Sequence, residues 1–145
     1  MYKSKNILIT GASSGLGKQL ALSYAGQGGR IINISRNNQK GVMLNNQLHI
    51  VNNLNNKFFS ADVSKYQEIV NIKDKLIGEK IYPDVIINNA AGNFLCPFEK
   101  LSKNGWSRVI DIVLNGSFNI YHTFGKELIE RKKKAVFLNI STSWC

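Results

Sequence analysis

Short apolar runs alternate with longer amphipathic stretches along the chain. Within the longer stretches, apolar residues recur every three or four positions, which is typical of helices that bury one face. The short runs are rich in β-branched residues and end in small or polar ones, which is typical of strands buried in a sheet. We expect strands at 6–9, 31–36, 58–63 and 84–88, and a fifth that begins at Phe137. Alternation of strands and helices predicts one α/β domain over residues 1–145.

Three of the helices carry patterns that predict how they begin or pack. In the first helix, Leu16, Leu20 and Tyr24 share one face. Ser64 and Gln67 have the spacing of a capping box, which predicts the start of the third helix. The third helix has an apolar stripe formed by Ile69, Ile72, Leu76 and Ile77. A long helix from about 104 to 131 carries Val109, Ile110, Val113, Phe118 and Leu128.

The first strand leads into a glycine-rich turn, Thr10-Gly-Ala-Ser-Ser-Gly-Leu-Gly17, with the spacing Gly-x3-Gly-x-Gly. Glycines let the backbone turn tightly and approach a pyrophosphate closely. The helix that follows then directs its free N–H groups and its positive dipole end at the anion. The turn therefore predicts a dinucleotide site. The residues expected to contact the cofactor here are Gly11, Ser13, Ser14, Gly15, Leu16 and Gly17.

The residue at the end of the second predicted strand indicates which dinucleotide is bound. In dinucleotide folds this position reads the adenosine ribose, and an acidic residue there accepts a hydrogen bond from the 2′-hydroxyl of NAD. In this chain the residue is Arg36, whose planar, charged guanidinium suits a 2′-phosphate. Ser14, in the glycine-rich turn, can add a hydroxyl donor. We therefore expect NADP in preference to NAD.

Taken together, these segments resemble the short-chain dehydrogenase/reductase family. Its members carry a Thr-Gly-x3-Gly-x-Gly turn, an Asp-Val pair after the third strand and an Asn-Asn-Ala-Gly loop after the fourth. The counterparts here are the turn at 10–17, Asp62-Val63 and the loop at 88–92, which has one extra alanine. The resemblance implies a Rossmann-like, doubly wound parallel sheet, truncated after the fifth strand, that binds a nicotinamide cofactor at the carboxyl ends of its strands. It also implies a homo-oligomer joined through the long helix. It adds to the cofactor site Asp62, Val63, Asn89, Ala90 and Ala91.

A narrower resemblance, to the 2,4-dienoyl-CoA reductase branch, rests on the segment Asn93-Phe94 after this loop and on Ser102, Trp106 and 111–116. In that branch the asparagine matching Asn93 hydrogen-bonds the thioester carbonyl, and the residues matching Phe94 and Ser102 contact the acyl-CoA. Hydride delivered to the far end of a conjugated dienoyl thioester moves charge onto the carbonyl oxygen, which a fixed amide donor stabilises. The resemblance implies an NADPH-dependent reductase of unsaturated fatty acyl-CoA, with Asn93 as a catalytic residue.

The chain also departs from this branch. Trp144 stands where the branch has a tyrosine as the second donor to the thioester, and Ser64 stands where it has an arginine that contacts CoA. The family's Tyr-x-x-x-Lys is absent, and the only Ser-x-x-x-Lys, Ser14 to Lys18, lies in the cofactor turn. We expect the chain to be the N-terminal part of a reductase. Two interpretations remain open: an enzyme completed by further sequence, or a non-catalytic cofactor-binding remnant.

Composition and charge exclude several other classes of function. The formal net charge is +10, but the basic residues are scattered, and the run at 131–134 lies at a predicted helix end, so we expect no nucleic-acid partner. Cys96, Cys145, His49 and His122 lack metal-ligand spacing, and we expect no metal. The chain has no apolar run of about 18 residues, which predicts no membrane span. Only five residues precede the first strand, which leaves no room for a leader, and we expect a cytoplasmic protein.

Overall fold

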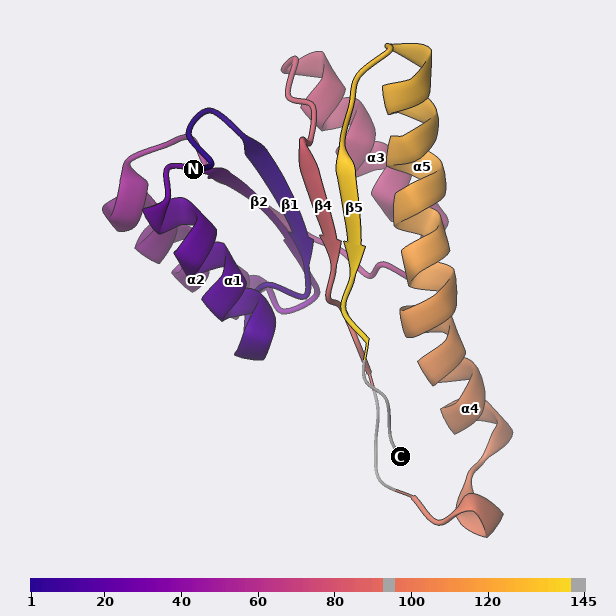
Figure 1. The fold of residues 1–145 in the computed structure, drawn as a ribbon. Helices are drawn as coiled ribbons and strands as arrows, with labels where there is room; N and C mark the ends of the chain where they lie inside the picture. The colour runs from indigo at the N-terminus through magenta and orange to yellow at the C-terminus, as the bar shows by residue number, and fades with distance from the viewer. Residues whose placement is uncertain (93–95, 142–145) are drawn as a thin grey trace.

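Within residues 1–92 and 96–141, which the computed structural model describes, a five-stranded sheet has the order β3-β2-β1-β4-β5 (Figure 1). All four neighbouring pairs of strands are parallel. The strands are β1 (Asn6–Thr10), β2 (Arg30–Ser35), β3 (Lys57–Ser60), β4 (Val85–Asn88) and β5 (Val136–Asn139). The predicted third strand at 58–63 is therefore shorter, because residues 61–63 have already left the sheet.

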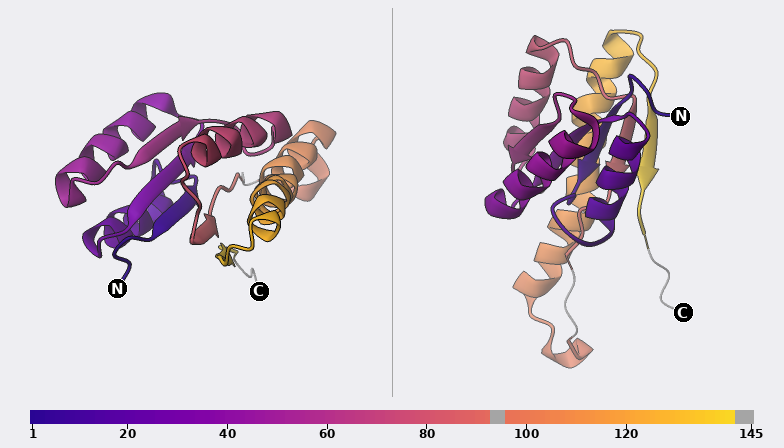
Figure 2. Two further views of the ribbon diagram at one scale, coloured as in Figure 1. Left: turned by 90° about the horizontal axis from the view of Figure 1, so that it is seen from above. Right: turned by 90° about the vertical axis from the view of Figure 1, so that its left-hand side faces the viewer.

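Helices cover both faces of the sheet (Figure 2). They are α1 (Gly15–Gly26), α2 (Asn38–Asn52), α3 (Tyr66–Gly78), α4 (Lys103–Ile110) and α5 (Gly116–Glu130), with short segments η1 (Phe98–Lys100) and η2 (Asp111–Asn115). One core lies between the sheet and α1 and α2, and the other lies between the sheet and α3 and α5. The predicted fold class, a doubly wound parallel sheet, is confirmed. None of the helices in the described ranges is both long and apolar enough to cross a membrane.

Helix α1 packs on the sheet through small residues rather than through the face that carries Leu16, Leu20 and Tyr24. The helix buries Gly17, Ala21 and Ala25. Leu16 is 54% exposed, and Leu20 and Tyr24 lie half-buried at the edge of the core. The start of the helix approaches the preceding turn so closely that a Cβ atom on Gly17 would lie 2.6 Å from the carbonyl oxygen of Gly11. Only glycine fits that approach at position 17.

Helix α3 buries the face that the sequence predicts but begins differently. Of the predicted stripe, Ile69, Ile72 and Leu76 are buried. The capping box of Ser64 and Gln67 is not formed, because the N-cap is Lys65 and no side chain caps the helix. The Ser64 hydroxyl instead donates to Asp62 Oδ1 at 2.7 Å, and the Asp62 N–H donates to Glu68 Oε2 at 2.8 Å. The segment before α3 is thus folded around Asp62.

The long helix expected at 104–131 is divided into α4 and α5 by η2, which is π-helical. A π-helical turn contains more residues than an α-helical one, so it rotates the buried face of the sequence that follows. The residues that this segment and α5 bury include Ile112, Ile120, Phe124 and Leu128. Two members of the predicted stripe, Val113 and Phe118, are instead 45% and 59% exposed. Only Leu128 of the predicted stripe is fully buried.

Candidate functional site

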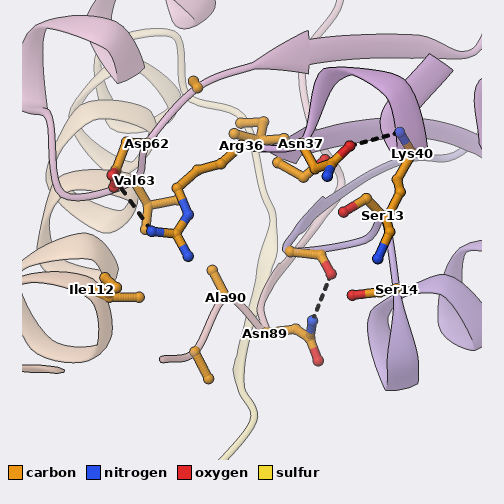
Figure 3. Close-up of a pocket in the computed structure, with 15 residues that line it drawn as sticks. Ser13, Ser14, Arg36, Asn37, Lys40, Asp62, Val63, Asn89, Ala90 and Ile112 are labelled. Atoms are coloured by element: carbon orange, nitrogen blue, oxygen red, sulfur yellow. Dashed lines mark hydrogen bonds and ion pairs between the residues drawn. The ribbon is translucent and has the colours of Figure 1, made fainter. Parts of the chain in front are cut away.

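A cavity of about 650 Å³ lies at the carboxyl ends of the strands (Figure 3). It sits beside β1 and β4, where the chain order of the strands reverses, and ligands of open α/β sheets bind at this point. Segments that follow β1, β2, β3 and β4 form its walls. Of the predicted cofactor residues, those that line it are Gly11, Ser13, Ser14, Arg36, Asp62, Val63, Asn89, Ala90 and Ala91. The structure thus brings four distant parts of the sequence together.

The backbone of the glycine-rich turn has the features that a pyrophosphate requires. Gly11 and Gly15 have φ angles of +67° and +53°, in the left-handed region that disfavours side chains. A Cβ atom on Gly11 would lie 2.9 Å from Ala90 Cα, whereas one on Gly15 would meet no atom within 4 Å. Helix α1 begins at Gly15 without a side-chain cap and without an acidic residue in its first turn. The open space over Gly15 and the uncapped N–H groups fit an anion.

The remaining two residues predicted from this turn contribute differently. Like Gly15, Leu16 and Gly17 do not line the cavity. Gly17 is buried beneath the turn, where it allows the close packing of α1. The Leu16 side chain is exposed, so only its backbone can face an anion at the helix start.

Asn89 holds the β4 loop against the glycine-rich turn. Its side-chain amide donates to the carbonyl oxygens of Thr10 at 3.0 Å and Gly11 at 3.3 Å. The backbone N–H groups of Asn89 and Ala90 both donate to the Thr10 hydroxyl, at 3.1 and 3.0 Å. Sequence reasoning treated Thr10 only as part of the turn, but its hydroxyl joins the two loops that line the cavity.

Asp62 and Arg36 face each other across the cavity. Arg36 Nη1 lies 3.9 Å from Asp62 Oδ2, and Figure 3 shows the guanidinium extended toward Asp62 and Val63. Burial alone would raise the pKa of Asp62. Hydrogen bonds from the Ser64 hydroxyl and N–H, together with the charges of Arg36 and Arg108, outweigh that effect, and the pKa of Asp62 is lowered. The carboxylate is therefore ionised at neutral pH and accepts hydrogen bonds.

The start of α2 adds residues that the sequence analysis missed. Asn37 and Lys40 both line the cavity, and the Asn37 side chain accepts from the Lys40 N–H at 2.9 Å to cap the helix. Figure 3 shows the Lys40 side chain extending toward Ser13 and Ser14. In the sequence, Lys40 lies four residues after Arg36, in the first turn of the helix that follows. That position could have identified Lys40 as a residue of the cavity.

Of the predicted catalytic and substrate residues, only Ser102 lies within the described residues, and it does not line this cavity. Asn93, Phe94 and Trp144 lie outside the residues that the structure describes. The Ser102 hydroxyl accepts from the Gly105 N–H at 3.0 Å and caps α4. Ser102 also lines a separate hollow of about 540 Å³. Within the described ranges, no group of three or more His, Cys, Asp or Glu side chains could hold a metal ion.

Comparison with known proteins matches this chain to one protein family. A family model described as short chain dehydrogenase matches residues 5–144. A probable 2,4-dienoyl-CoA reductase from Bacillus subtilis is 34% identical, over 98% of this chain and 56% of its own length. Another from Caenorhabditis elegans is 30% identical, over 99% of this chain and 47% of its own. The crystal structure of a short chain dehydrogenase from Bacillus anthracis superposes with a TM-score of 0.88 at 36% identity, over 94% of this chain and 55% of that one. The chain spans about half the length of these relatives.

Proposed function

The chain belongs to the short-chain dehydrogenase family, and we propose that its cavity holds NADP(H) for the reduction of an unsaturated fatty acyl-CoA. The observation that carries the cofactor proposal is the meeting, at the switch point of the sheet, of the uncapped start of α1, Arg36 and the Asp62-Val63 segment. The bound nicotinamide would supply a hydride. The residues of this chain would bind and orient the rest of the cofactor.

Each part of the cavity suits a different part of the dinucleotide. The N–H groups at the start of α1 and the open space over Gly15 suit the pyrophosphate. The ionised Asp62 and the apolar Val63 suit the polar edge and the face of the adenine. Arg36 suits the 2′-phosphate. Among the described residues that line the cavity, the only carboxylate is Asp62, and it follows β3 rather than β2.

Binding tests the choice of cofactor. We expect NADPH to bind more tightly than NADH, and Arg36→Met to weaken NADPH binding by about 10- to 100-fold, the effect of losing one charge-assisted contact. NADH binding should change little. The measurement is titration of the intrinsic fluorescence of each reduced cofactor, with circular dichroism to verify the fold. Arg131→Met, at the far end of α5, serves as the matched control. Equal affinity of the unchanged protein for both cofactors would contradict the NADP assignment.

The substrate proposal rests on the likeness to proteins named 2,4-dienoyl-CoA reductases and on Asn93, Phe94, Ser102 and Trp144. The Asn93 amide would donate to the thioester oxygen as hydride reaches the far carbon of the diene. The assay is NADPH oxidation with a dienoyl-CoA, by this chain and by this chain extended with the C-terminal half of a family member. Asn93→Ala in the active form should lower kcat by about 10²- to 10³-fold, as for loss of one oxyanion donor. An unchanged kcat would contradict that role.

A second candidate function is cofactor binding without turnover. The specific observation in its favour is that the 145 residues contain no Tyr-x-x-x-Lys and only one Ser-x-x-x-Lys, Ser14 to Lys18, in the cofactor turn. NADPH binding without dienoyl-CoA turnover by either form in the assay above would favour this candidate.

Self-association is part of the proposal. Exposed apolar side chains occur along α4, η2 and α5, and they include Trp106, Val113, Leu114 and Phe118. A surface of this kind commonly marks a protein interface. Light scattering after gel filtration should show an oligomer that Phe118→Asp weakens, and a monomer at micromolar concentration would contradict this part of the proposal.

A further inference from the structure

Lys40 is the second cation of the cavity, and it is not engaged by an acidic group. Its side chain extends toward Ser13 and Ser14, which line the same cavity (Figure 3). Within the described residues, no carboxylate lies at ion-pair distance from Lys40. An anion that enters this side of the cavity therefore meets an ammonium group that has no ion pair to give up.

Arg36 is in a different situation. Its guanidinium points away from Ser13 toward Asp62, with the nearest nitrogen and oxygen atoms 3.9 Å apart. To bind a phosphate near the start of α2, Arg36 must give up part of its interaction with that carboxylate. Loss of the Asp62 interaction offsets part of the attraction between Arg36 and the phosphate.

The helix that carries Lys40 adds to the positive potential on the same side. Helix α2 begins at Asn38, and its first turn contains no acidic residue. The positive end of the helix dipole and the Lys40 ammonium thus lie at the same wall of the cavity. The Asn37 cap holds the backbone of Lys40 at 2.9 Å, so the base of this side chain is fixed in position.

We propose that Lys40 is a specificity-determining residue that binds the cofactor's 2′-phosphate jointly with Arg36. The proposal rests on the proposed NADP(H) function and deepens it. A phosphate monoester carries close to two negative charges at neutral pH. The single Arg36 guanidinium, which already faces the Asp62 carboxylate, cannot balance both charges. Preference for NADPH over NADH therefore survives the loss of Arg36 and disappears only when both cations are removed.

The test is a double-mutant cycle of binding constants. NADPH and NADH are titrated by fluorescence into the unchanged protein, Lys40→Met, Arg36→Met and the double variant, and 2′,5′-ADP and 5′-AMP are titrated as competitors. Lys40→Met should weaken NADPH and 2′,5′-ADP by about 10-fold and change NADH and 5′-AMP by less than about 2-fold. Arg36→Met alone should keep a preference for NADPH, and the double variant should show none. Lys40→Arg, which keeps the charge, should keep the preference.

The controls separate this inference from the function on which it rests. Lys126→Met changes an exposed lysine on α5, away from the cavity, and should leave all four ligands unaffected. If Lys40→Met leaves the size of the NADPH preference unchanged, or weakens NADPH and NADH equally, the role of Lys40 alone is overturned. If the unchanged protein binds NADPH and NADH equally, the proposed cofactor is wrong and Lys40 has no 2′-phosphate to read.

Discussion

Asn33, in the middle of β2, buries an amide that has no hydrogen-bond partner in the part of the chain that the structure describes. The residue is 0% exposed, and both Oδ1 and Nδ2 are unpaired there. Asn56 offers the matched opposite case. It is also buried, but its Oδ1 accepts from the Ile31 N–H at 2.8 Å and its Nδ2 donates to Asn52 Oδ1 at 3.0 Å. One chemical change at these two positions should therefore have opposite effects on stability.

Leucine has nearly the shape of asparagine, so Asn→Leu removes the amide with little change in packing. At Asn33 the change removes a buried polar group that gains nothing in the folded state, and the free energy of unfolding should rise by about 1–3 kcal/mol. At Asn56 it leaves the Ile31 N–H buried without its acceptor, and the free energy of unfolding should fall by about 1–3 kcal/mol.

Urea unfolding followed by circular dichroism measures both effects. The midpoint should move to higher urea for Asn33→Leu and to lower urea for Asn56→Leu, with similar slopes. Asn46→Leu, at an exposed position of α2, controls for the added apolar surface in the unfolded chain. Destabilisation by Asn33→Leu, relative to this control, would refute the reasoning, since it would mean that the Asn33 amide is paired.

Three other substitutions test the packing and electrostatics of the site. Gly17→Ala should abolish most NADPH binding in titration, because its Cβ would lie 2.6 Å from the Gly11 carbonyl oxygen and displace the turn; normal binding would contradict this reading. Gly41→Ala should lower the free energy of unfolding, because a Cβ at this position would overlap the Phe58 ring. This loss should outweigh the preference of helices for alanine over glycine, which is about 1 kcal/mol. A higher urea midpoint for Gly41→Ala would contradict the prediction. Asp62 has a lowered pKa, so its ionised form stabilises the fold above about pH 4 and that stability is lost as the pH falls through the folded-state pKa. Acid titration should therefore show a shallower loss of stability for Asp62→Asn than for the unchanged protein, and parallel curves would contradict this.

The strands and the glycine-rich turn could be predicted because their signals are local. In the apolar run at 85–87, Ile86 and Ile87 lie in the cores on opposite faces of the sheet, so the composition of the run alone indicates a central strand. The left-handed φ of Gly11 and Gly15 is likewise a property of the residue type as much as of its surroundings. Arg36 lines the cavity because the end of β2 has a fixed relation to the turn after β1 in a parallel sheet.

What the sequence by itself determined is thus the order of strands and helices, the turn that begins α1 and the positions that follow each strand. The tertiary structure decided which helix faces are buried and which side chains meet. Helix α1 turns Ala21 rather than Leu20 toward the sheet because its first turn lies against the backbone of the preceding loop. The Thr10 hydroxyl and Lys40 enter the site because β4 and α2 bring distant residues to the same edge of the sheet. Such contacts depend on distances between elements, and periodicity along one element carries no information about those distances.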